Sequence, residues 1–267
     1  MTIPRPPLLR KRGAWAAGRR TTGIAIDLGS ARTRAWIPDR GLVFDVPTTT
    51  LSGGEVCHPV RRGTVVDPDA AASMLDHRLG RPAGFGRYSI AVVTIPVLCT
   101  DHHRSTALTA LKVLDARTVL TIHSVKAAAL GAGAGLDQPL LVVDVGAHLT
   151  EVGLLVDGGV THGRRIEAGT SDLGATTTVA ELVQSIVAMV TGLLRLDCGG
   201  QVVDALERGP LLTGGGALRP EITYRLAKRL VAPVRPAAAP QFAAVRGAGL
   251  ALVAAGHHPS VPLEGLL

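Results

Sequence analysis

One stretch of sequence occurs twice in this chain, and the repeat constrains the fold more than any other feature. Residues 24–37 read IAIDLGSARTRAWI, and residues 141–154 read LVVDVGAHLTEVGL. In each copy an apolar run ends in Asp, one apolar residue and a Gly follow, and a Thr lies six positions after the Asp. The matching positions are Asp27 and Asp144, Gly29 and Gly146, and Thr33 and Thr150.

Each copy predicts a strand, a tight turn and a returning strand, which together form a β-hairpin. The glycine lets the backbone come close to a ligand because it has no Cβ. Successive backbone N–H groups in such a turn can form a concave site for an anion. The aspartate at the strand end can hold water around a Mg²⁺ ion, which prefers oxygen ligands. One copy alone would be consistent with an ordinary hairpin, whereas two copies with matched spacing indicate a repeated function.

A third stretch, Pro210–Leu218, runs from a short strand into three glycines and then a helix. A glycine-rich entry to a helix N-terminus brings the backbone close to a flat or phosphate-bearing ligand. It is the third candidate ligand-binding segment of the chain.

The rest of the chain alternates between strand and helix patterns in both halves. Strands are predicted at 42–46, 89–96, 119–122, 140–145, 149–156 and 159–166. Helices are predicted at 68–79, 101–114, 124–130, 176–196 and 220–230. Such alternation favours a largely parallel sheet flanked by helices, so the predicted fold class is α/β, with one plan used twice.

The three stretches resemble the phosphate-1, phosphate-2 and adenosine motifs of the actin-like ATPase superfamily, and their order and flanking residues look most like MreB/Mbl-type, rod shape-determining bacterial actins. The resemblance covers nearly all of residues 22–252, with gaps. It implies an actin-like (ribonuclease H-like) duplicated fold, with two similar α/β domains around a nucleotide cleft. Little sequence is left at residues 48–62, and little after Asp172, for the two outer lobes of the family, which are therefore expected to be reduced or absent.

The resemblance divides the chain into four parts. Residues 1–21 form a basic arm, 22–137 the first actin-like domain, 138–255 the second, and 256–267 a tail. The arm holds six of the Lys and Arg residues behind the net charge of +7, which leaves about +1 for the rest. No basic stripe with interleaved aromatic residues suggests a nucleic-acid groove, so no nucleic-acid partner is expected.

The ligand that the resemblance implies is ATP or ADP with Mg²⁺. The implied nucleotide-binding residues are Asp27, Gly29, Ser30, Ala31, Arg32, Thr33, Asp144, Gly146, Ala147, His148, Gly214, Gly215, Gly216 and Ala217. Asp27 and Asp144 are the implied Mg²⁺ sites, each acting through water, and are expected to face each other across the cleft.

The chain departs from the family pattern at two places. After Gly146 the family has further glycines and a threonine, whereas this chain has Ala147, His148 and Leu149. The family also places a water-orienting carboxylate at a strand–helix junction, where residues 122–125 read IHSV and contain no Asp or Glu. His123 is a candidate substitute base, with an unperturbed pKa of about 6.5, or a structural histidine. His148 is either a phosphate contact or an ordinary loop residue.

Three functions fit these observations. The first is a divergent bacterial actin that binds ATP weakly and self-associates into filaments with cell-wall synthesis proteins as partners. The second is a pseudo-ATPase that serves as a binding or scaffold module without turnover. The third is a metabolic enzyme of the superfamily such as a sugar kinase, although no catalytic Asp in a separate substrate lobe is visible.

The expected location is the cytoplasm, with peripheral contact at the inner face of the cell membrane as an open alternative. Trp15 in the basic arm, and Phe85 in the Gly84–Gly86 loop, are candidate membrane contacts. The arm is equally consistent with a solvated tail. The three cysteines, Cys57, Cys99 and Cys198, are isolated in the sequence and form neither a disulfide framework nor a metal motif, which fits a reducing compartment.

Overall fold

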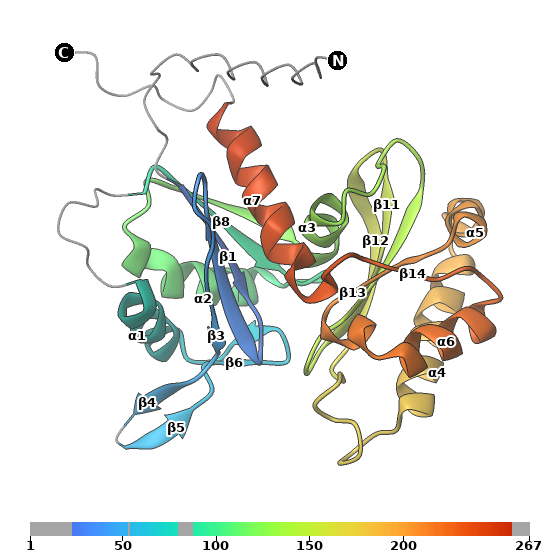
Figure 1. The fold of residues 1–267 in the computed structure, drawn as a ribbon, viewed down its shortest axis with the longest axis horizontal. Coiled ribbons are helices and arrows are strands. Elements are labelled where there is room, and N and C mark those ends of the chain that lie inside the picture. The colour runs from blue at the N-terminus through green and yellow to red at the C-terminus, as the bar shows by residue number, and fades with distance from the viewer. Residues whose placement is uncertain (1–22, 53, 80–87, 258–267) are drawn as a thin grey trace, which may run out of the picture.

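The computed structural model describes residues 23–52, 54–79 and 88–257, and it contains two five-stranded mixed sheets that lie side by side (Figure 1). The first sheet is formed by β1 (Gly23–Leu28), β2 (Arg32–Ile37), β3 (Gly41–Pro47), β8 (Ile90–Ile95) and β9 (Thr118–His123). The second is formed by β10 (Leu140–Val145), β11 (Thr150–Val156), β12 (Gly159–Ile166), β13 (Leu211–Thr213) and β14 (Arg235–Pro236).

The two sheets share one topology. The strand orders are β3-β2-β1-β8-β9 and β12-β11-β10-β13-β14. In each, the first three strands form an antiparallel meander, and the last two add in parallel. The predicted duplication of an α/β plan is therefore confirmed.

Helices cover both sheets. They are α1 (Pro68–Leu79), α2 (Asp101–Ala110), α3 (Ser124–Gly131), α4 (Val179–Leu194), α5 (Gly199–Arg208), α6 (Pro220–Leu230) and α7 (Ala243–Gly256). Short 3-10 turns lie at Leu111–Leu114, Gly215–Leu218 and Pro240–Phe242. Helices α1 and α2 cover the outer face of the first sheet, α4 to α6 that of the second, and α3 and α7 lie between the sheets (Figure 1).

The central strands are buried because their sequences are almost continuously apolar. Every residue of β8 is buried, as are most residues of β1 and β10. Such runs are typical of strands covered on both faces. The core is built from Ala, Val, Leu and Ile, and its largest fully buried side chains include Ile24, Leu141 and Ile186.

Helix α4 shows how local sequence sets an element boundary. The Thr178 hydroxyl accepts a hydrogen bond from the Glu181 N–H at 3.2 Å, and the Glu181 carboxylate accepts one from the Thr178 N–H at 2.7 Å. This capping box starts the helix at Val179, three residues after the predicted start at 176. The stretch after it, for which no element was predicted, forms the separate helix α5.

The outer parts of both halves are small. The elements described between β3 and β8 are the hairpin of β4 (Thr50–Ser52) and β5 (Glu55–Cys57), the hairpin of β6 (Val60–Arg61) and β7 (Thr64–Val65), and α1. In the second half, only residues 173–178 separate Asp172 from α4. Within the described residues, no helix combines the length and the apolar character needed to cross a membrane. The basic arm and the Phe85 loop lie outside the described residues.

Helices α3 and α7 cross at two glycines. A Cβ on Gly131 would overlap the carbonyl oxygen of Ala243, and a Cβ on Gly247 would overlap that of Ala127. Helix α7, from the end of the chain, packs on β1 and β8 of the first sheet, whereas α3 packs on β10 and β11 of the second. The crossing therefore joins the two halves back to back.

We expect Gly247→Val to lower the free energy of unfolding by about 1–3 kcal/mol, since a branched side chain would push α7 away from the α3 backbone. Thermal denaturation measures this as a fall of roughly 2–4 °C in Tm for each kcal/mol. Gly200→Ala is the matched control, because a Cβ there meets no atom within 4 Å. An unchanged Tm for Gly247→Val would contradict the close crossing.

Candidate functional site

A cavity of about 380 Å³ lies between the two sheets and is lined by both hairpin turns. Asp27 and Gly29 reach it from the first half, and Asp144 and Gly146 from the second. The adenosine-like loop closes another side with Gly214 and Gly215. All three stretches singled out in the sequence therefore meet at one place.

The two turns have the same backbone geometry. The Gly29 N–H donates to the Arg32 carbonyl at 3.2 Å, and the Gly146 N–H donates to the Leu149 carbonyl at 2.9 Å. A Cβ on either glycine would stand 2.8 Å from that same carbonyl oxygen. Both positions therefore need glycine to keep the turn closed, and the strand-end aspartate is presented in the same way in each half.

The matched threonines buttress these turns from beneath. Both Thr33 and Thr150 are fully buried. The Thr33 hydroxyl lies 2.8 Å from the Thr48 hydroxyl, which donates to the Gly29 carbonyl at 2.7 Å. The Thr150 hydroxyl donates to the Ala168 carbonyl at 2.8 Å. Their role in this structure is to hold the turns rather than to reach the cavity.

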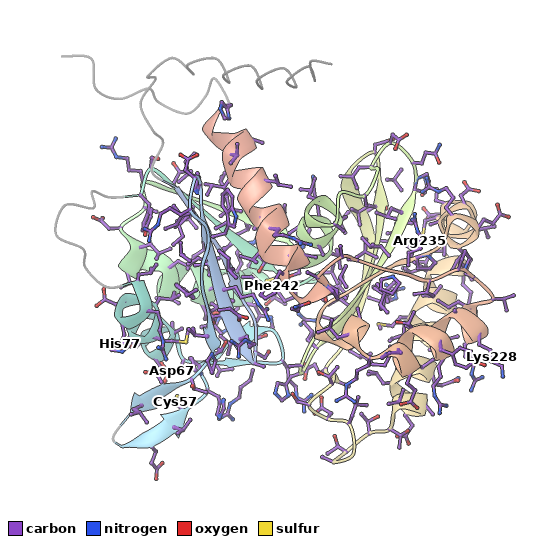
Figure 2. The ribbon with its side chains drawn as sticks, viewed as in Figure 1. Cys57, Asp67, His77, Lys228, Arg235 and Phe242 are labelled. Carbon is purple, nitrogen blue, oxygen red and sulfur yellow. The ribbon has the colours of Figure 1, made fainter. Side chains whose placement is uncertain are left out.

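Asp27 is held by neighbours from two strands. Its Oδ1 accepts a hydrogen bond from the Thr94 hydroxyl at 2.8 Å, and its Oδ2 lies 3.4 Å from Arg34 Nη1. Arg34 also lies 3.2 Å from the Asp45 carboxylate. The Arg34 guanidinium stacks over the Phe242 ring at 5.4 Å, and Phe242 lies between the two sheets (Figure 2). The Asp27 carboxylate is thus oriented before any ligand arrives.

The ionisation of Asp144 is affected by the negative charge of Asp27, which lines the same cavity. Burial, and then the negative charge of Asp27, raise the pKa of the Asp144 carboxyl to about 6. The Thr213 hydroxyl and Arg34 oppose this shift in pKa. Two carboxylates that repel each other in a small cavity form a site where a divalent cation would relieve the repulsion.

Glu151 is a cavity residue that sequence reasoning missed. It lies opposite Asp144 in the β10–β11 pair, is only 4% exposed, and accepts a hydrogen bond from the Val97 N–H at 2.5 Å. Burial, and then the charge of Asp144, raise the pKa of Glu151 to about 8. The sequence could have predicted this position, because Glu151 follows Asp144 by seven residues. In a hairpin with this turn, that spacing pairs the two residues across the strands.

The adenosine-like loop uses its glycines for two different purposes. A Cβ on Gly214, where φ is +79°, would overlap Asp144 Oδ1, and a Cβ on Gly216 would overlap the Val145 side chain. These two glycines let the loop lie against β10. A Cβ on Gly215 would meet nothing within 4 Å, so Gly215 is the glycine that leaves open space at the cavity wall.

The second turn departs from the family pattern in a way that the structure explains. Leu149, which stands where the family has a polar residue, is buried and packs across the cleft: a Cβ on Gly63 would stand 2.5 Å from its Cδ2. Arg62 adds contacts from the same β6–β7 turn, to the Glu167 carbonyl and, at 3.3 Å, to Asp172 Oδ1. The two halves are therefore joined by apolar and ionic contacts on this side of the cavity.

The two histidine candidates have different positions. His148 lines the cavity. His123 instead lines a second cavity between β9, α3 and α7, with its Nδ1 3.3 Å from the Pro96 carbonyl. The reason is the junction itself: His123 ends β9, and the chain turns into α3 at Ser124, which is the residue that faces the main cavity. The structure does not bring His123 to the site.

Most of the predicted nucleotide-binding residues come together. Those that line the cavity are Asp27, Gly29, Ser30, Ala31, Arg32, Asp144, Gly146, Ala147, His148, Gly214 and Gly215. Thr33, Gly216 and Ala217 lie behind its wall and are buried. The combination of two backbone turns, two facing carboxylates and an open glycine at Gly215 fits a phosphate-bearing ligand with a hydrated divalent cation.

The raised pKa of Glu151 predicts how stability depends on pH. The folded protein keeps this proton up to about pH 8, whereas the unfolded chain releases it near the ordinary value of 4.5. The folded state therefore binds more protons between these values, and the free energy of unfolding falls as the pH rises, by at most about 1.4 kcal/mol per pH unit. Glu151→Gln removes this term, so the variant should gain stability over the wild type from pH 5 to pH 8.

Denaturant unfolding at several pH values measures this difference. The exposed Glu55→Gln is the control and should follow the wild type at every pH. A constant offset between Glu151→Gln and the wild type across the range would mean that Glu151 is ionised in the folded state.

Comparison with known proteins agrees with this architecture. The family model described as MreB/Mbl protein matches residues 50–176. The cell shape-determining protein MreB of Escherichia coli (strain K12) is 24% identical over 327 aligned positions, which cover 88% of this chain and 94% of the relative. The cell shape-determining protein Mbl of Bacillus cereus (strain ATCC 10987 / NRS 248) is also 24% identical, with 86% and 95% covered. Both alignments exceed the 267 residues of this chain, so both relatives contain segments that have no counterpart here.

Solved structures show the same fold. MreB 5 of Spiroplasma citri bound to AMPPNP has a TM-score of 0.80 at 17% identity, over 89% of this chain and 98% of that one. The MamK double helical filament has a TM-score of 0.68 at 16% identity, over 89% and 100%. Two duplicated sheets and paired turns at one cavity give this chain the actin-like fold, and the sequence matches support a divergent protein similar to the MreB/Mbl family.

Proposed function

We propose that this chain binds ATP or ADP with Mg²⁺ in the central cavity and serves as an MreB-like cytoskeletal or scaffold protein in cell shape and cell-wall synthesis. One observation carries the proposal: two turns of the same geometry bring Asp27 and Asp144 to one cavity. Among solved structures of similar fold, MreB5 of Spiroplasma citri is bound to AMPPNP in one and to ADP in another. The MamK neighbour is a filament.

Each half has a matching role in this proposal. The backbone of Gly29, Ser30 and Ala31 would hold one side of the phosphates, and that of Gly146 to His148 the other. Asp27 and Asp144 would hold the Mg²⁺ through its water shell, and the metal would supply charge neutralisation for the phosphates. Gly215 would leave room for the nucleoside, with the backbone at Pro240 and Gln241 beside it.

We expect nucleotide to act mainly as a structural ligand, with slow turnover or none. Among the described residues that line the cavity, the carboxyl groups are Asp27, Asp144 and Glu151. The first two are assigned to the metal, and the pKa of Glu151, raised to about 8, keeps that carboxyl protonated at neutral pH. A protonated acid cannot orient or activate water as a base. A scaffold without turnover is the second candidate function, favoured by Ser124 at the junction where the family has its carboxylate.

Partners and location follow from the same proposal. The chain would self-associate into filaments and contact cell-wall synthesis proteins. It would then be a cytoplasmic protein near the inner face of the membrane. Peripheral membrane contact through the arm or Phe85 stays a prediction, since both lie outside the described residues.

Nucleotide binding is tested by isothermal titration of full-length protein with ATP and Mg²⁺. We expect Asp27→Ala and Gly215→Val each to weaken binding by at least about tenfold, or 1.4 kcal/mol. The first removes a water contact of the Mg²⁺, and the second fills the open space beside the nucleoside. Gly200→Ala should bind as the wild type does. Equal affinity in all four proteins would show that the ligand binds outside this cavity. If the wild type does not bind nucleotide, the scaffold function is the candidate that is left. Pelleting with and without ATP measures self-association separately.

Turnover is tested by restoring a carboxylate. We expect Ser124→Glu to raise ATP hydrolysis by about 10²-fold or more, the usual contribution of a positioned base, because Ser124 faces the cavity. His123→Glu is the matched control one residue away: it faces the second cavity and should leave hydrolysis at the wild-type rate. A phosphate-release assay measures both. Equal rates in the two variants would show that the missing carboxylate is not what limits turnover.

A further inference from the structure

A cluster of three metal-ligating side chains lies in the second half, away from the nucleotide cavity. His162 on β12 and the adjacent Asp197 and Cys198, in the turn between α4 and α5, each offer a ligand atom, and these atoms all lie within 4.8 Å of one another. From this cluster we propose that the chain holds a Zn²⁺ ion, which ties the edge strand β12 to the α4–α5 turn. The proposal does not depend on nucleotide binding.

The position of His162 is set by an irregularity in the sheet. On β11 the consecutive residues Leu154 and Leu155 pair with His162 and Val160, so Thr161 is left unpaired as a β-bulge. Without the bulge, Val160 and His162 would point to the same face, as residues two apart on a strand do. With it, Val160 packs into the α3 side of the sheet, whereas His162 shares the face of Leu154, which packs beneath α4 and α5. Bulges often re-aim a side chain in this way.

The other two ligands come from the turn on that face. Cys198 is a free thiol, only 4% exposed, in the core cluster beneath α4 and α5. Asp197 is 92% exposed, so the side of the cluster facing solvent is open. A thiolate from the core and a carboxylate from the surface thus approach the imidazole from different directions.

The separation between two of the three ligand atoms fits zinc. Tetrahedral zinc ligands about 2.0–2.3 Å from the ion lie roughly 3.3–3.8 Å from one another. His162 Nε2 and Asp197 Oδ1 are 3.6 Å apart, which is too long for a hydrogen bond and right for two ligands of one ion. His162 Nδ1 is buried and has no hydrogen-bond partner among the described residues.

The donor set also selects the metal. One sulfur, one imidazole nitrogen and one carboxylate oxygen suit Zn²⁺, whereas Mg²⁺ takes oxygen ligands and keeps its waters. Three protein ligands leave a fourth position for water. Binding would release the thiol proton of Cys198, since the thiolate is the ligand.

Cobalt titration of metal-free, full-length protein tests the site. Co²⁺ takes the place of Zn²⁺ and gives a near-ultraviolet charge-transfer band only when a thiolate binds it. We expect one equivalent of Co²⁺ to produce this band, and one equivalent of Zn²⁺ to remove it. Cys198→Ser should abolish the band, and His162→Ala and Asp197→Asn should each weaken Co²⁺ binding by at least about tenfold.

Two controls separate this site from other thiols and from the nucleotide cavity. The double variant Cys57→Ser/Cys99→Ser should keep the band, since both cysteines belong to the first half; Cys57 is the last residue of β5 (Figure 2). Asp144→Asn should also keep it. His162 is partly exposed and Asp197 is exposed, so His162→Ala and Asp197→Asn remain informative if the buried Cys198→Ser fails to fold.

The proposal is overturned if the wild type shows no charge-transfer band, if the band disappears in the Cys57→Ser/Cys99→Ser variant, or if His162→Ala and Asp197→Asn bind Co²⁺ as tightly as the wild type does.

Discussion

The close crossing of α3 and α7 is the constraint on which the rest of the structure depends. At Gly131 and Gly247 the two helices touch backbone to backbone, so the layer between the sheets is thin. Because α7 packs on the first sheet and α3 on the second, the distance between these helices sets the distance between the sheets. Only at this spacing do the turns that follow β1 and β10 open into one cavity.

The electrostatics of that cavity follow from its symmetry. Because both copies of the turn open into this cavity, a second aspartate lies near the first, and burial and the negative charge of Asp27 raise the pKa of Asp144. Glu151 adds a third carboxyl group, which burial and the charge of Asp144 keep protonated at neutral pH. Arg34 offsets part of this charge from beneath Asp27, where Phe242 and Asp45 hold it. The proposed cation site and the protonated Glu151 carboxyl thus both follow from placing three carboxyl groups in a small volume.

The departures of this chain from the family pattern are also structural. Leu149 lacks the hydroxyl group that the family's threonine would offer to a ligand. In the folded protein, however, it packs against Gly63 of the other half. The ionic contacts of Arg62 with the segment at residues 167–172 lie beside it. Contacts that join the two halves directly reduce the dependence of their arrangement on a bound ligand, which agrees with the proposal that nucleotide turnover is slow or absent. The division into domains at residues 22–137 and 138–255 stays a prediction, and α7 shows how the end of the chain returns to the first sheet.

The duplicated α/β plan, the two turns and the glycine loop could all be predicted from the sequence. Each of these is a local pattern: an apolar run that becomes a strand, and glycines where the turn leaves no room for a Cβ. The features that could not be predicted involve residues far apart in the chain. Glu151 lines the cavity although it was not predicted to, and His123 does not line it although it was a candidate. The position of each side chain depends on which way its strand faces at that residue. The helix α5 was missed, and α4 begins at its capping box, three residues after the predicted start at 176. His162 came to face Cys198 because a single bulge in β12 reversed its direction, and no spacing in the sequence records that. Side-chain direction depends on register and packing between distant segments, and these are set only when the sheets assemble.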